Sequence, residues 1–112
     1  MSNYSEEAVA ILKIFEERAE EKFNLRAERH GKFIGNTKTS TIMERLLDEV
    51  CELIVAFYDP AEFDSVLKLM RGSLDYIDRK ESFDSVETEL YDVRNLTRIM
   101  YVCGVNNGDI VL

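Results

Sequence analysis

"ETELYDVRNLTRIM", residues 87–100, is typical of an amphipathic α-helix that carries acids on its apolar side. At about 100° per residue, Val93 and Leu96 fall within about 40° of Glu89. Asp92 lies about 60° from Glu89, so it belongs to the same apolar stripe. The stretch therefore predicts a packed helix that directs two carboxylates toward the side it is expected to bury.

The chain around this helix has the length and composition of a soluble domain. Its 112 residues suffice for one domain, and 46% of them are hydrophobic. The net charge of −8 argues against a nucleic-acid or anionic-lipid partner, because an acidic surface repels both. The longest apolar run, residues 53–58, is too short to span a bilayer, and no signal-peptide pattern precedes it. We expect one cytoplasmic domain over residues 1–112, with 104–112 as a tail, and no membrane partner.

Four segments repeat apolar residues at helical spacing, with start and stop signals between them. Helices of this length with short connections favour antiparallel neighbours. The fold class is therefore all-α, an antiparallel four-helix bundle, and residues 73–79 are expected to add a turn or two after the third helix. The helices are predicted at residues 5–23, 41–59, 60–71 and 84–103, the last of them beginning at residue 82 or 84.

Local signals mark the ends of these helices. Gly72 follows the third helix, and Gly104 suits the left-handed position that ends the fourth. A strand signal is confined to residues 109–112. In a capping box, a residue with a side-chain acceptor precedes a glutamate by three positions at the start of a helix. The sequence predicts such boxes for the second, third and fourth helices, at Thr41–Glu44, Asp59–Glu62 and Asp84–Glu87.

A second acid pair lies in "LLDEVCELI", residues 46–54. Glu49 and Glu52 are three residues apart, so they are neighbours on the helix surface, with Glu49 at the border of the apolar stripe. If the two packing faces meet, four carboxylates converge. Two unit charges 4 Å apart interact at about 4 kcal/mol even at an effective dielectric of 20, so the cluster needs a cation. Carboxylate oxygens suit Mg²⁺, with Mn²⁺ also possible, and the single histidine, His30, argues against zinc and di-iron sites.

Simpler interpretations of the acids stay open at this point. Glutamates three residues apart usually form a solvated helix face, and Glu89 could pair with Arg45 or Arg98 in a structural ion pair. Cys51 and Cys103 lack metal-type spacing and are interpreted as small core or interface residues.

A basic segment, residues 24–41, separates the first two helices. It carries a charge of +3, whereas the rest of the chain carries −11. Cationic side chains, glycine-rich backbone and a helix N-terminus can bind phosphate together. The alternative is that these cations neutralise the glutamates of the first helix. The candidate phosphate-binding residues are Arg26, Arg29, Lys32 and Lys38.

The acid motifs resemble those of a known family. "DEVCEL", residues 48–53, and "ELYDVRNL", residues 89–96, resemble the E-E-x-x-E and E-x-x-D signature of the all-α MazG-like nucleoside triphosphate pyrophosphohydrolases, with Asp48 in place of the usual first glutamate. "ERHGK" at residues 28–32 and "DVRNLTRIM" at 92–100 are similar to the dATP/dGTP pyrophosphohydrolase branch. The resemblance covers residues 22–103.

This resemblance implies a helical bundle, completed by oligomerisation into a homodimer or homotetramer. It also implies Mg²⁺-dependent hydrolysis of a nucleoside triphosphate to the monophosphate and pyrophosphate. The general base is expected to be one of the inner glutamates or Asp48, and Glu49 is the candidate we choose. By position, the resemblance makes Glu49, Glu52, Glu89 and Asp92 metal ligands, Asn95 a nucleotide contact, and Lys32 and Lys38 phosphate contacts.

A different functional class also fits an acidic helical chain. Such a chain can be a non-enzymatic interaction protein, for example a regulator or a mimic of the charge of DNA. That function requires acids on exposed faces, whereas the patterns of residues 46–54 and 87–100 direct some of them toward the packing faces.

Overall fold

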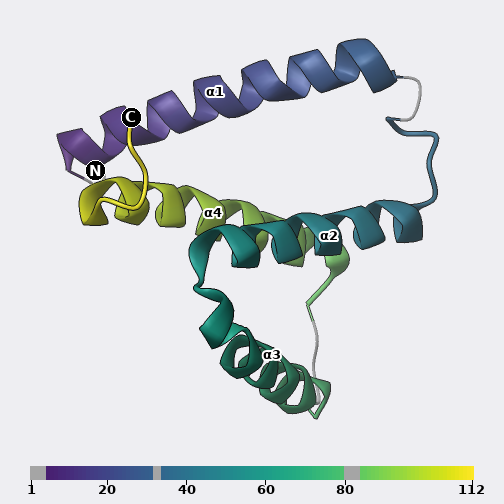
Figure 1. Ribbon diagram of the computed structural model, residues 1–112. Helices are drawn as coiled ribbons and strands as arrows, with labels where there is room; N and C mark the ends of the chain where they lie inside the picture. Colours follow the sequence, from purple (N-terminus) through teal and green to yellow (C-terminus); the bar gives the residue numbers. More distant parts are fainter. Residues whose placement is uncertain (1–4, 32–33, 80–83) are drawn as a thin grey trace. The chain divides into compact units, whose positions relative to one another are not determined.

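The computed structural model describes residues 5–31, 34–79 and 84–112. These residues form four α-helices and a short 3₁₀ helix and contain no strand, so the all-α fold class is confirmed (Figure 1). Contacts divide the chain into two units, α1 with α4 and α2 with η2 and α3, which are described in turn. The elements are α1 (Glu6–His30), α2 (Thr39–Phe57), η2 (Pro60–Glu62), α3 (Phe63–Asp78) and α4 (Val86–Asn107).

In the first unit, α1 and α4 are antiparallel, with the N-terminal part of α1 beside the C-terminal part of α4 (Figure 1). Ser5 caps α1 by accepting a hydrogen bond from the Ala8 N–H at 3.1 Å. Phe15 packs on Tyr101 with ring centroids 4.7 Å apart. Ile11, one turn before Phe15 on the same helix, is buried.

Helix α1 continues about two turns beyond the predicted end at residue 23. Its last residue is His30, so Arg26 and Arg29 lie on a helix rather than in a loop. The added segment, residues 24–30, contains leucine, arginine, alanine and glutamate, which all have high helix propensity. Lys32 lies outside the described residues.

The C-terminal end of α4 corrects a second prediction. The helix passes through Gly104 and ends at Asn107, where Gly108 has the left-handed conformation with φ 84°. The N–H groups of Asp109 and Ile110 donate to the Gly104 carbonyl at 2.8 and 3.0 Å. The tail therefore folds back on α4 as a cap, and the strand signal at residues 109–112 does not produce a strand.

In the second unit, α2 begins at Thr39 with Lys38 at the N-cap and no capping side chain, so the predicted box at Thr41 is wrong. The capping box at Asp59 is confirmed. The Asp59 carboxylate accepts a hydrogen bond from the Ala61 N–H at 3.0 Å, and the Glu62 carboxylate accepts one from the Asp59 N–H. Helix α3 runs through Gly72 to Asp78, which confirms the added turns.

Few apolar side chains are buried among the described residues. Ile11 and Val66 are the buried large ones, whereas Leu69 in α3 and Leu96 in α4 are 67% and 64% exposed. Assembly into a four-helix bundle, and its completion by oligomerisation, therefore stay predictions. A search of the described helices finds none with the length and apolarity that a bilayer crossing requires.

Candidate metal centre

Three carboxylates gather at the start of α4. Ser85 is the N-cap residue, with its Oγ accepting from the Thr88 N–H at 3.1 Å, so Asp84 stands just ahead of the first turn. Glu89 and Asp92 follow three residues apart, on adjacent positions of the helix surface. Ligand oxygens of Asp84, Glu89 and Asp92 all lie within 4.8 Å of one another, and all three residues are exposed. The described part of the chain thus contains an acidic triad that could hold a metal ion.

Asp84 was missed as a ligand because the sequence offers it as a helix cap. The predicted box with Glu87 does not form, since Ser85 takes the N-cap and its hydroxyl also bonds to the Thr88 hydroxyl at 3.0 Å. Two residues with capping ability stand side by side, and only one of them can be the N-cap. Because Ser85 is the N-cap, the Asp84 carboxylate makes no cap and belongs to the triad.

The triad is not on the side of α4 that packs against α1. At about 100° per residue, Asp92 lies about 180° from Tyr101, which contacts Phe15 of α1. The apolar stripe beside the triad stays open, with Val93 44% and Met100 40% exposed. The expectation that Glu89 and Asp92 would be dry is therefore not met among the described residues.

Arginine does not neutralise the triad in the described residues. Arg98, one of the predicted partners of Glu89, instead places its Nε 2.7 Å from Glu16 Oε1. Arg94 Nη2 lies 3.4 Å from the same oxygen. Across residues 5–31, 34–79 and 84–112, no ion pair of Glu89 or Asp92 is found.

The second acid pair lies on α2, in the other unit. A hydrogen bond with Glu49, followed by the negative charge of Glu49, raises the pKa of Glu52 above its ordinary value of 4.5. Slight desolvation and the negative charge of Asp48 add to the rise, and the positive charge of Arg45 opposes it. The negative charge of Glu49 thus acts on Glu52, and a proton or another cation at this position would relieve the repulsion. Both residues are exposed.

The basic candidates are spread over two elements. Arg26 and Arg29 lie on the last turns of α1, and Lys38 is the N-cap of α2. The alternative that these cations neutralise the glutamates of α1 is not observed, because in the described ranges none of them forms an ion pair with a glutamate. Asn95 is exposed on α4, one turn beyond Asp92.

The donor set of the triad fits a hard divalent cation. Two oxygens bound to one Mg²⁺ are at most about 4.2 Å apart, and two bound to one Ca²⁺ at most about 5 Å, because each lies about 2.1 or 2.5 Å from the ion. The 4.8 Å limit thus accommodates Ca²⁺ directly, and Mg²⁺ or Mn²⁺ after a small rotation of exposed side chains. The geometry is compatible with a divalent cation and does not select Mg²⁺.

No family model matches the chain, and neither does any curated protein or solved structure.

Proposed function

We propose that the protein is a MazG-like hydrolase that cleaves a nucleoside triphosphate to the monophosphate and pyrophosphate in the presence of Mg²⁺. The observation that carries the proposal is the triad of Asp84, Glu89 and Asp92, whose ligand oxygens lie within 4.8 Å of one another. Two of its members are the acids of the E-x-x-D motif. Without a cation their charges repel, and no arginine or lysine of the described residues offsets them.

The metal ligands of the proposed enzyme are Glu49, Glu52, Glu89 and Asp92, to which the triad adds Asp84. A bound Mg²⁺ would polarise the phosphate and lower the pKa of a water molecule. Glu49 is the proposed general base, which accepts a proton from the attacking water.

The substrate phosphates carry negative charge that the acids cannot offset. Arg26, Arg29 and Lys38 supply the proposed phosphate contacts, together with Lys32, which is outside the described residues. A guanidinium group can donate two parallel hydrogen bonds to phosphate oxygens, so it positions the triphosphate of the substrate as well as neutralising its charge. Asn95, one turn from Asp92, is the proposed nucleotide contact.

We also propose that the helices assemble into the predicted bundle within a homodimer or homotetramer. The support is the open apolar surface of each unit, such as Leu69 and Leu74 of α3 at 67% and 65% exposure. Large exposed apolar faces of soluble proteins mark interaction surfaces. Covering them would also dry the surroundings of the acids and strengthen their hold on a cation.

The test is product analysis with a panel of nucleoside triphosphates and Mg²⁺. We expect pyrophosphate and the monophosphate, and we expect Glu89→Gln to abolish turnover without loss of helix content. The matched control is Glu87→Gln on the same helix, because the Glu87 carboxylate accepts a hydrogen bond from Tyr91 and lies outside the triad. Normal turnover by Glu89→Gln, or orthophosphate as the product, would contradict the proposal.

A second candidate is an acidic interaction protein without catalytic activity. The observation in its favour is that the motif acids are exposed, as are the glutamates on one face of α1. A charge mimic should respond mainly to ionic strength, whereas a specific site is stabilised by its own metal through mass action. Thermal unfolding in Mg²⁺ and in an equal ionic strength of NaCl separates the two.

A further inference from the structure

The C-terminal half of α1 separates its charges by sign. At about 100° per residue, Lys22 and Arg26 lie about 20° to either side of Phe15, and Arg18 lies about 60° from it. The acids occupy the other side, where they line one open surface together. Its glutamates are Glu17, Glu20, Glu21 and Glu28.

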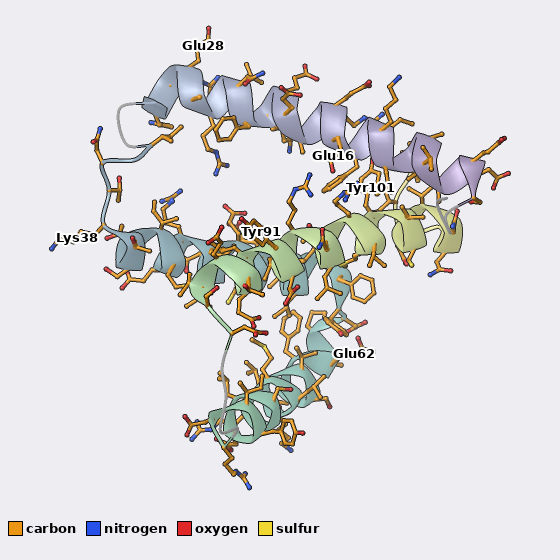
Figure 2. The ribbon with its side chains drawn as sticks, turned by 180° about the vertical axis from the view of Figure 1, so that it is seen from behind. Glu16, Glu28, Lys38, Glu62, Tyr91 and Tyr101 are labelled. Carbon is orange, nitrogen blue, oxygen red and sulfur yellow. The ribbon has the colours of Figure 1, made fainter. Side chains whose placement is uncertain are left out.

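The cationic side of α1 continues the surface that packs on α4. Phe15 stacks on Tyr101, and Arg18 Nη1 donates to the Tyr101 hydroxyl at 3.4 Å. Around this contact α4 adds Arg94 and Arg98, whose guanidinium groups contact Glu16 of α1, and Lys22 and Arg26 continue the same side of α1 beyond it. Glu16 and Tyr101 mark this region between α1 and α4 in Figure 2. We call Arg18, Lys22, Arg26, Arg94 and Arg98 the basic face.

One carboxylate, that of Glu16, contacts two of these five cations. Glu16 Oε1 is the oxygen that contacts both Arg98 Nε, at 2.7 Å, and Arg94 Nη2, at 3.4 Å. Arg98 Nε is buried, yet its N–H is not aligned with any acceptor. Lys22 and Arg26 form no ion pair in the described part of the chain. Positive charge therefore exceeds negative charge on this face of a protein that is acidic overall.

The arrangement of the basic face costs the helix stability. Arg18, Lys22 and Arg26 follow one another at four-residue spacing, where like charges destabilise a helix. The helix dipole favours cations in the last turn, as at Arg29, but its effect does not extend to Arg18 or Lys22. Local helix energetics thus do not explain the basic face, whereas a bound anion would.

We propose that the basic face binds the condensed phosphate chain of a small anion, inorganic triphosphate or a nucleoside triphosphate, without a metal ion. Guanidinium groups form paired, charge-assisted hydrogen bonds with phosphate oxygens. The phosphate chain replaces Glu16 as the partner of Arg94 and Arg98. This binding goes beyond the proposed hydrolysis, because it needs no divalent ion and uses the side of α4 opposite Asp92. Arg26, at the far end of the basic face, is the one residue that both proposals use, so the variants that test the basic face are made at Arg18 and Lys22.

A short anion fits the basic face better than a nucleic acid does. Proteins that bind single strands offer aromatic rings for base stacking, and here Phe15 is already stacked on Tyr101. The glutamates on the other side of α1 would repel a long polyanion that extends past the face. A compact phosphate chain avoids both problems.

The test is calorimetric titration of the full chain with inorganic triphosphate in the presence of EDTA. We expect Arg18→Gln with Lys22→Gln to weaken binding about tenfold or more, as the loss of charge-assisted bonds implies. The control is Lys68→Gln with Arg71→Gln, which removes the same charge from exposed positions of α3. Glu16→Gln should tighten binding, because it removes the competing carboxylate.

The same titration with a nucleoside triphosphate identifies the source of the phosphate chain. Tighter binding of the nucleotide shows that the nucleotide is the natural form, equal affinity shows that the bare chain suffices, and both results support the proposal. No binding of either, or equal losses in the two double variants, would overturn it. So would binding of a single-stranded oligonucleotide alone, or a basic-face variant that unfolds more easily in the absence of any phosphate ligand. Because EDTA removes divalent ions, a failure of hydrolysis leaves the result unaffected.

Discussion

Replacement of Gly104 by alanine tests the contact between α4 and the folded-back tail. A Cβ atom at Gly104 would lie 2.7 Å from Ile110 Cδ1 and 3.0 Å from Ile110 Cγ1. Both distances are too short for carbon atoms, so the Ile110 side chain must move. The substitution also removes a glycine from the helix, which by itself stabilises a helix by about 1 kcal/mol.

The two effects of Gly104→Ala have similar size and opposite sign. Complete burial of an isoleucine stabilises by about 1.5–3 kcal/mol, and Ile110 is about half-buried, so its displacement costs about 1 kcal/mol plus strain. We expect Gly104→Ala to leave the free energy of unfolding unchanged or to lower it by about 1 kcal/mol. In an Ile110→Ala background the clash is gone, and the same change should stabilise by about 1 kcal/mol.

The assay is urea unfolding of the wild type, both single variants and the double variant, followed by circular dichroism. The double-mutant cycle should give a coupling energy of about 1–2 kcal/mol between positions 104 and 110. If Gly104→Ala stabilises equally in both backgrounds, the tail does not rest on α4 and the account of the C-terminal cap is wrong.

Two further predictions concern the surroundings of the acids. Ser85→Ala should lower the free energy of unfolding by about 1 kcal/mol, because the Thr88 N–H loses its acceptor. The control, Ser40→Ala inside α2, should change this free energy by less than about 0.5 kcal/mol. Urea unfolding measures both variants, and equal losses would contradict the assignment of Ser85 as the N-cap. Glu49→Gln should lower the pKa of Glu52, measured by the NMR shift of its side chain against pH. Since the folded pKa of Glu52 is raised, protonation of Glu52 contributes stability that is complete below pH 4.5 and is lost as the pH rises through the raised value. An unchanged titration of Glu52 in Glu49→Gln would refute the influence of Glu49.

The sequence predicted correctly those features that depend on a few adjacent residues, such as the start of a helix. The Asp59, Pro60 and Glu62 combination was sufficient to place a helix start, because cap, ring and box partner lie within four residues. Gly72 did not end α3, since one glycine costs about 1 kcal/mol and the apolar positions Leu74 and Ile77 continue the stripe.

Other features depend on contacts that local patterns do not carry. Gly104 and Gly108 both fit a helix end, and the choice follows from the packing of Ile110 over Gly104. The role of Asp84 follows from the capture of the N-cap by Ser85. The spacing of Glu89 and Asp92 placed them side by side, but their exposure depends on which side of α4 contacts α1.

The most direct test of the central claim, that the motif acids bind a divalent cation, is a Mn²⁺ titration followed by electron paramagnetic resonance. The account predicts saturable loss of the free Mn²⁺ signal with the wild type and with Glu87→Gln, competition by Mg²⁺, and a large loss of affinity in Glu89→Gln. Equal Mn²⁺ binding by Glu89→Gln and the wild type, or no binding by the wild type, would contradict it.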